Sequence, residues 1–304
     1  MQSPTLFPRR FGLVALFFVV SLLFGACNTL TSLVINNEQE VEIGEQVADE
    51  IYDEFALLKD DDPVTQWATA LVDSMVDASD DYRDHTKFGG YEVHVIYDNE
   101  LVNAFAAPGG FVYIVSGLIM KANNCAEVAG VVGHELAHVT QRHSAKSIAK
   151  NAGLLGLTEI VLKEGITKDI AQGLYVFLQN THFSRKDETE ADKIGAEIMY
   201  KSGYHPQALA NMFRILAQIP PGEKPGEPNR FNEFFSSHPD SNRRIAAIEA
   251  QIEKSWPTVH EDGQHVFDCV GTDGELTFAQ VKERLASHDL PTQPGSGQKP
   301  HATP

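Results

Sequence analysis

Two histidines and a glutamate, His134, Glu135 and His138, form the pattern H-E-x-x-H within the segment 131–139. Residues four apart lie on one face of a helix, so the two imidazoles can take adjacent corners of a tetrahedral zinc site. Glu135 follows His134 directly and can reach a water bound to the metal. Zinc polarises a carbonyl and lowers the pKa of such a water, and a neighbouring carboxylate can take its proton. The pattern therefore predicts a metallopeptidase centre with Glu135 as general base.

The residues around this pattern favour a metal over a chance match. The chain has 12 histidines, so the pattern alone would be only suggestive. Val128, Val131, Val132, Leu136 and Val139 make the segment almost wholly apolar, which predicts a buried helix. Two histidines and a glutamate inside such a helix are costly unless something satisfies them. A bound zinc ion is the economical answer.

A third protein ligand must come from elsewhere in the chain. A third histidine close behind the motif would require glycine at position 141 and histidine at 144, but the chain has Gln141 and Ser144. His143 lies five residues beyond His138, about 140° round the helix. We therefore do not expect His143 to bind the same metal.

Carboxylates further along the chain are the other source of a ligand. The segment 184–192 contains Glu188, Glu190 and Asp192. On a helix, Glu188 and Asp192 share one face and Glu190 points away from it. If Glu188 binds zinc, Asp192 can orient a ligating imidazole through its second nitrogen. Helical spacing alone does not decide between the two faces.

H-E-L-A-H followed some fifty residues later by E-x-E-A-D resembles the HtpX-like and CAAX-prenyl-protease-type zinc metallopeptidases. The resemblance implies that His134, His138 and Glu188 bind one zinc ion per chain. It also implies that Glu135 is the base and that Asp192 orients a ligand. No transmembrane bundle is expected here, so the comparison favours the soluble periplasmic lipoprotein branch and does not carry over prenyl-protein processing.

The resemblance extends to two further segments, 103–118 and 237–245. The first implies a substrate-binding edge strand beside the active-site helix, formed by Gly110, Phe111, Val112, Tyr113 and Ile114. The second implies catalytic roles for His238 and Arg244. A cation-assisted donor opposite the metal would stabilise the tetrahedral oxyanion of peptide hydrolysis. His238 either fills that role or binds zinc as a fourth ligand in a resting state, which would close the open position that catalysis requires.

Hydrophobic spacing predicts the elements that must position these side chains. His94 falls in an alternating strand, which predicts that it faces solvent. Besides the helix of the zinc motif, which Asn123 or Asn124 can cap, the expected helices are 38–58, 63–76, 116–120, 169–182, 185–202, 206–217, 241–254 and 276–285. The expected strands are 91–97, 103–107, 111–115 and 264–270, with a turn at 108–110 between the second and third.

The first 26 residues predict an export signal. A basic pair precedes the apolar run 11–24, which is shorter than the about 20 residues of a spanning helix. The residues leading to Cys27 resemble the bacterial lipobox, in which this cysteine is lipidated, although Phe24 stands where leucine is preferred. Asn28, by the sorting rule of Gram-negative lipoproteins, favours the outer membrane. An ordinary signal peptide or an uncleaved anchor is the alternative.

The remainder of the chain divides into a tether at 27–37, a zinc metallopeptidase domain at 38–255 and a C-terminal extension at 256–304. The extension is rich in Pro, Gly, Ser and Gln from 291, which predicts disorder there. Cys125 and Cys269 stand 144 positions apart and show no framework spacing, so we expect free thiols.

Together these features predict a mostly α-helical α+β protein with a zincin-type metallopeptidase domain. The net charge of −18 argues against nucleic acid as a partner. An edge strand can pair with any extended peptide, which implies an endopeptidase for unfolded or mis-assembled envelope proteins. We expect a periplasm-facing lipoprotein, anchored in the membrane by its lipid, with outer-membrane assembly machinery as a candidate partner. The rival hypothesis is a binding or chaperone-like lipoprotein with a structural or self-blocked zinc site.

Overall fold

The computed structural model describes residues 35–151, 183–219, 234, 238, 241–261, 263–272, 274–287 and 290. Four predicted features lie outside these residues: the signal peptide, the lipidation site Cys27, the helix at 169–182 and the disordered end from 291. Within the described residues, no helix has the length and apolar character needed to cross a lipid bilayer.

Two N-terminal helices begin where the sequence provides local caps. Helix α3 (Asn37–Glu54) is capped by Asn36, which forms a reciprocal capping box with Gln39. Helix α4 (Pro63–Asp80) starts with proline at its first position, and the Asp62 side chain accepts a hydrogen bond from the backbone of Val64. Both predicted helices are confirmed, although α3 ends four residues before the predicted end at 58 and α4 runs four residues past the predicted end at 76.

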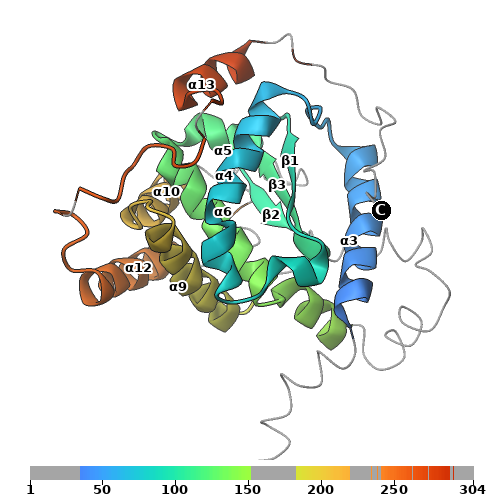
Figure 1. The fold of residues 1–304 in the computed structure, drawn as a ribbon, viewed down its shortest axis with the longest axis horizontal. Helices are drawn as coiled ribbons and strands as arrows, with labels where there is room; N and C mark the ends of the chain where they lie inside the picture. The colour runs from blue at the N-terminus through green and yellow to red at the C-terminus, as the bar shows by residue number, and fades with distance from the viewer. Residues whose placement is uncertain are drawn as a thin grey trace, which may run out of the picture.

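A three-stranded sheet lies between α3 and the remaining helices, in the order β1-β3-β2 (Figure 1). Strand β3 (Phe111–Val115) pairs in parallel with β1 (Glu92–Ile96) and antiparallel with β2 (Ala104–Ala106). A short 3₁₀ turn, η2 (Pro108–Gly110), joins β2 to β3, as the strand–turn–strand pattern predicts.

The prediction that residues 110–114 form an edge strand is wrong. Among the described strands, β3 is central, with β1 on one side and β2 on the other, and β2 is the edge strand that packs against the zinc-motif helix. The sequence shows the local β2–β3 hairpin, but it does not show that β1 adds in parallel to the other side of β3. Because both faces of β3 are covered, all five of its residues are buried.

Alternate residues of the sheet enter two hydrophobic clusters. Phe111, Tyr113 and Val115 face the cluster that includes α3, whereas Val112 and Ile114 face the cluster that includes α4 and the zinc-motif helix. This arrangement also corrects the prediction that His94 is a surface residue. His94 is 7% exposed and stacks on Tyr113, which lies opposite it in β3.

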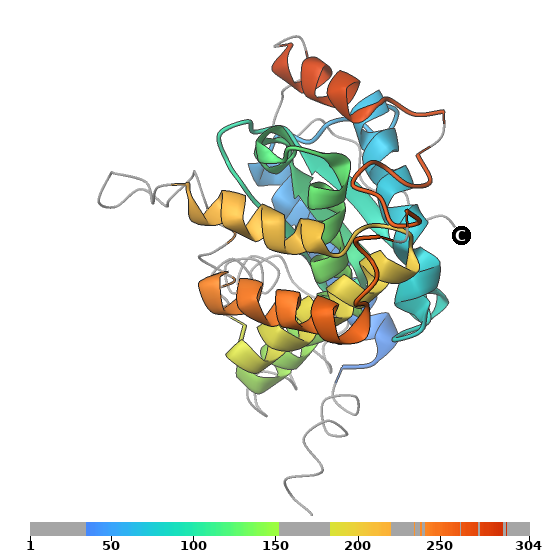
Figure 2. The same cartoon turned by 90° about the vertical axis from the view of Figure 1, so that its left-hand side faces the viewer.

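The helical half packs on the other face of the sheet (Figures 1 and 2). Most of its predicted helices are confirmed, with ends shifted by a few residues, and α9 begins with a capping box between Ser184 and Asp187. These helices are α5 (Ser116–Lys121), α6 (Cys125–Thr140), α9 (Arg185–Lys201), α10 (Gln207–Ala217), α12 (Ser241–Ser255) and α13 (Phe278–Ala286). A short 3₁₀ helix, η1 (His85–Phe88), precedes β1.

The C-terminal segment differs from the sequence-based expectation in two respects. Residues 264–270 do not form a strand. Their β-type pairing is one isolated bridge, between Val266 and Tyr204. Cys125 and Cys269 are joined by a disulfide, so the expectation of free thiols is wrong. Val281 and Leu285 are buried in the same cluster as α4 and α6, so the segment is part of the main core.

Candidate metal centre

Helix α6, which carries His134, Glu135 and His138, is buried along its whole length. It is capped by Asn124, whose side chain accepts a hydrogen bond from the backbone of Glu127. It packs against α9, α10, α4 and the edge strand β2. Its ionisable side chains therefore lie in the interior, where they need partners or a metal.

Helix α9 supplies the carboxylates because two glycines allow it to touch α6 at the backbone. A Cβ atom at Gly195 would lie 2.9 Å from the backbone nitrogen of His134, and one at Gly133 would lie 3.2 Å from the Gly195 oxygen. At this crossing, Glu188 and Asp192 face α6 and are buried. Glu190 lies outside this group, on the side of His143, and its side chain is 40% exposed. The structure thus resolves the choice between the two faces of α9 that spacing left open.

Replacing Gly195 with alanine is expected to lower the free energy of unfolding by about 1–3 kcal/mol, because the added methyl group must separate the two helices. The same separation moves Glu188 away from the α6 histidines, so zinc should bind less tightly. Denaturant unfolding and a zinc-binding titration would measure both effects. Thr189→Ala, an exposed substitution on the same helix, is the control. Wild-type stability in Gly195→Ala would contradict the close crossing.

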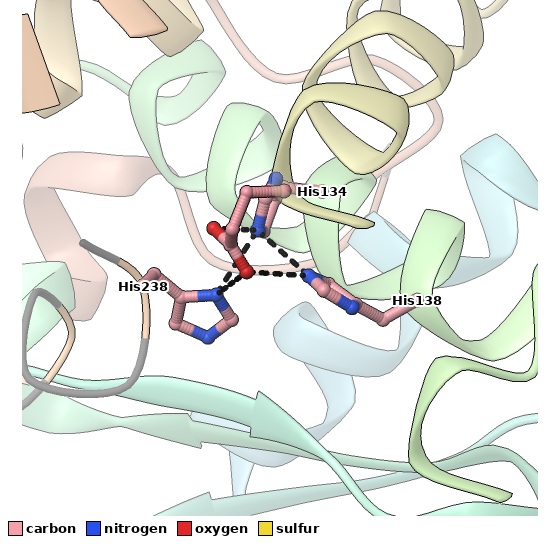
Figure 3. A group of neighbouring side chains, drawn as sticks. His134, His138 and His238 are labelled. Carbon is pink, nitrogen blue, oxygen red and sulfur yellow. Dashed lines mark hydrogen bonds and ion pairs between the residues drawn. The ribbon is translucent and has the colours of Figure 1, made fainter. Parts of the chain in front are cut away.

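Four side chains converge on one point between α6, α9 and the segment before α12 (Figure 3). The Nε2 atoms of His134 and His138 are 3.0 Å apart, and Nδ1 of His238 lies 3.3 Å from Nε2 of His134. Oε1 of Glu188 lies 3.5 Å from Nε2 of His138 and 2.9 Å from Nδ1 of His238. One donor atom from each of these residues lies within 4.8 Å of the others, and all four residues are buried.

This donor set fits a zinc ion. Burial lowers the pKa of His134 to about 4 and that of His138 to about 3, so both rings are neutral at pH 7. Nδ1 of His134 lies 3.0 Å from Asp192, which places its proton there and leaves a lone pair on Nε2. A tetrahedral zinc ion at 2.0–2.1 Å from each nitrogen places two nitrogens about 3.3 Å apart, close to the spacing of the two Nε2 atoms.

The carboxylate of Glu188 is held in its charged form. Burial raises its pKa, but the positive charge of His238 and the hydrogen bonds from His138 and His238 lower it by more, so the net shift is downward. An ionised carboxylate beside the neutral imidazoles of His134 and His138 is the combination that zinc sites use.

Glu135 lies beside this group without belonging to it. Its Oε1 atom is buried and, among the described residues, accepts no hydrogen bond, with Nε2 of His238 3.6 Å away. Burial raises the pKa of Glu135 to about 7, opposed by His238 and by a hydrogen bond from the backbone of Ala106. A carboxylate with such a pKa can accept and release a proton near neutral pH.

Arg244 binds two of the acidic residues of α9, Asp192 and Glu188. Its Nε and Nη2 atoms lie 2.8 and 2.6 Å from Asp192, and Nη1 lies 2.6 Å from Glu188. Nη1 also donates to the backbone oxygen of His238, and the guanidinium stacks over Phe213. Arg244 therefore lies behind the ligand cluster, with its donors directed at carboxylates and backbone.

His143 lies close to the centre for a reason that helical spacing misses. Helix α6 ends at Thr140, and Arg142 has a positive φ of 56°, so the chain turns sharply instead of continuing the helix. Nδ1 of His143 consequently lies 2.9 Å from Nδ1 of His138, on the side of that ring away from the cluster. His143 is not one of the four clustered residues, as expected, but the continuous helix from which we predicted this is absent.

The chain is similar to known metallopeptidases. The family model described as "Peptidase family M48" matches residues 64–252. "Mitochondrial metalloendopeptidase OMA1" of Arabidopsis thaliana is 31% identical over 160 residues, which cover 53% of this chain and 31% of that protein. "Beta-barrel assembly-enhancing protease" of Yersinia pestis is 32% identical over 211 residues, or 65% and 41% of the two chains. "Metalloprotease YcaL" of Escherichia coli strain K12 is 32% identical over 171 residues, or 53% and 61%. The matched region spans less than two thirds of each relative.

Proposed function

Since the chain belongs to peptidase family M48, we propose that it is a zinc-dependent metalloendopeptidase acting on unfolded or mis-assembled envelope proteins. The observation that carries the proposal is the convergence of His134, His138 and Glu188 beside the carboxylate of Glu135, whose Oε1 atom accepts no hydrogen bond from a described residue. A purely structural zinc site has no use for a buried base at that position.

His134, His138 and Glu188 would hold the zinc ion, which supplies Lewis-acid polarisation of the substrate carbonyl and lowers the pKa of water. Glu135 accepts a proton from the water that attacks the peptide carbonyl carbon. It then returns this proton to the nitrogen of the departing amine as the C–N bond breaks. Its raised pKa suits both steps, because the group must exchange a proton near neutral pH.

Asp192 and Arg244 position the ligands. Asp192 accepts the Nδ1 proton of His134 and so fixes the tautomer that leaves Nε2 free for metal. Arg244 holds Asp192 and Glu188 at a fixed separation through two charge-assisted contacts. Since its donors are already engaged, we assign Arg244 a positioning role and not the catalytic role that the family resemblance implied.

Strand β2 is the element we propose for binding substrate. It is the edge of the sheet on the side of α6, and the backbone of Ala106 donates a hydrogen bond to Glu135. A peptide that pairs with β2 would therefore pass directly beside the base. An edge strand binds an extended peptide through backbone hydrogen bonds, so binding does not depend on the side chains of the peptide. This mode suits unfolded substrates.

His238 is proposed as a resting-state ligand that limits activity. Its Nδ1 atom lies 3.3 Å from Nε2 of His134 and 2.9 Å from Oε1 of Glu188, so it would take the position that a catalytic zinc site leaves open for water or substrate. If this closed form predominates, His238→Ala should raise the rate of hydrolysis by more than about twofold. Initial rates with a quenched fluorescent peptide would measure the change. A slower variant would instead make His238 a donor to the oxyanion.

The disulfide between Cys125 and Cys269 supports an exported protein, since such bonds persist in oxidising compartments. We propose a lipoprotein anchored through Cys27, facing the periplasm from the outer membrane. One relative is named a beta-barrel assembly-enhancing protease, so unfolded outer-membrane proteins and their assembly machinery are the partners we propose.

The function is tested by incubating the purified mature protein with casein, with added zinc and with a chelator. Cleavage that needs zinc and is lost in Glu135→Gln would establish the peptidase. One bound zinc ion per chain without cleavage, in both the wild type and His238→Ala, would favour the chaperone-like binding protein.

A further inference from the structure

The two imidazoles of His138 and His143 meet at their Nδ1 atoms, 2.9 Å apart and buried. We propose that His143 is a positioning residue that fixes the tautomer and orientation of His138, as Asp192 does for His134. The inference rests on the proposed function in one respect: it assumes that His138 binds zinc through Nε2.

The position of one proton determines the arrangement. A nitrogen-to-nitrogen distance of 2.9 Å is that of a hydrogen bond, so one of the two Nδ1 atoms carries a hydrogen and the other accepts it. If His143 donated, neutral His138 would carry its own proton on Nε2 and could not present a lone pair to the metal. Zinc binding by His138 therefore requires that His138 donates and that His143 accepts. Neutral His143 then carries its proton on Nε2.

Two carboxylates of α9 face that proton. Nε2 of His143 is buried and makes no hydrogen bond to any described residue, and it lies 3.6 Å from Glu190 and 3.8 Å from Asp187. These carboxylates favour a proton at Nε2, and therefore a free lone pair at Nδ1. The other oxygen of Asp187 is held by the capping box with Ser184, which fixes this residue at the start of α9. One helix thus carries the ligand Glu188 and the acidic residues that orient His143.

The backbone on the other side of His143 is also fixed. Arg142, whose positive φ turns the chain back toward α6, donates from Nε to the buried carboxylate of Glu40, 2.7 Å away. Arg83 binds the same carboxylate and donates to the backbone oxygen of Val139 near the end of α6. Helix α3 therefore holds the turn that delivers His143 to His138.

The same three residues, His143, Asp187 and Glu190, could in principle hold a second cation. That use needs a lone pair on Nε2 of His143 and hence a proton on Nδ1, facing His138. The proton would then compete with the one that zinc-bound His138 must donate. A second cation requires His143 to donate the hydrogen bond between the two Nδ1 atoms, whereas zinc at His138 requires His138 to donate it. We therefore favour a positioning role for His143.

The experiment compares zinc affinity, by competition with a chromophoric chelator, in wild type, His143→Leu and His143→Asn. Leucine removes the acceptor, and the dissociation constant should rise about 10- to 100-fold, as for other residues that orient metal-bound histidines. Asparagine can place a carbonyl oxygen where Nδ1 was and should restore most of the affinity. His94→Leu, the same change at a buried histidine in β1, is the control and should leave zinc affinity unchanged.

Long-range ¹⁵N–¹H spectra of the zinc-loaded wild type provide a second readout that does not depend on how the variants fold. We expect His143 to be protonated on Nε2 and His138 on Nδ1. Unchanged zinc affinity in His143→Leu, or a His143 protonated on Nδ1, would overturn the inference. So would a second bound zinc ion that is lost in Glu190→Gln. None of these measurements uses hydrolysis, so a protein that binds zinc as expected but cleaves nothing would refute only the proposed function.

Discussion

Glu135→Gln is expected to lower kcat/KM for peptide hydrolysis by about 10²- to 10⁴-fold while the protein still binds one zinc ion per chain. Glutamine has nearly the same shape as glutamate but cannot take a proton from water. Glu135 is not among the four clustered ligand residues, so the substitution leaves every metal donor in place. It also replaces a buried carboxylate that lacks a partner at Oε1, so the folded state should not be destabilised.

Activity, zinc content and thermal unfolding would be measured together on the same preparations. Glu127→Gln is a matched control, because Glu127 is also a buried glutamate of α6, two turns before Glu135. The Glu127→Gln variant should retain hydrolysis. Its stability should fall slightly, because the hydrogen bond from the backbone of Asn123 to the side chain of residue 127 weakens. If Glu135→Gln lost zinc as well as activity, the carboxylate would be a ligand and the assignment of the base would be wrong.

The parts of the site that the sequence predicted are those set by local periodicity. His134 and His138 need only one turn of helix to share a face, and Glu188 and Asp192 need the same. The starts of α3, α4 and α9 follow from a cap and its partner within three residues. Each of these features depends on chain neighbours alone, so it can be read before the fold is known.

What the sequence did not predict depends on contacts between distant segments. The family resemblance places the edge strand at 110–114, and nothing in the sequence corrects it, because β1, the second partner of β3, comes from a separate segment with no turn signal linking them. His94 alternated with apolar residues as a half-exposed strand residue would, yet α3 covers its face of the sheet. His143 was placed on a continuous helix because arginine, unlike glycine, gives no warning of a positive φ at position 142.

Replacing both Cys125 and Cys269 with alanine is expected to lower the free energy of unfolding by about 3–5 kcal/mol. The bond joins residues 144 positions apart, so in the unfolded chain it closes a very long loop. The entropy of closing such a loop corresponds to about 5 kcal/mol, and relaxation of the unfolded state reduces the measured effect. Since domains of this kind are stable by about 5–15 kcal/mol, the loss would be a large fraction of the total.

The location of the bond suggests what else should change. Cys125 is the first residue of α6, and the next residue, Ala126, donates its backbone N–H to the carbonyl of Phe267 in the C-terminal segment. The segment therefore supplies an acceptor to the start of the helix that carries the zinc ligands, and the disulfide holds it there. Without the bond, the first turn should fray while His134, more than two turns away, keeps its contacts with α9.

Denaturant unfolding with and without a reducing agent separates this effect from a simple packing change. The reductant should destabilise wild type to nearly the level of the double variant and leave the double variant unchanged, while zinc affinity stays within about threefold in both. A loss below about 1 kcal/mol, equal with and without reductant, would mean that buried contacts such as Val281 and Leu285 hold the C-terminal segment without help. A loss of the full amount of about 3–5 kcal/mol would instead show that the stability of the protein depends on the disulfide. Such a bond persists in an oxidising compartment and is reduced in the cytosol.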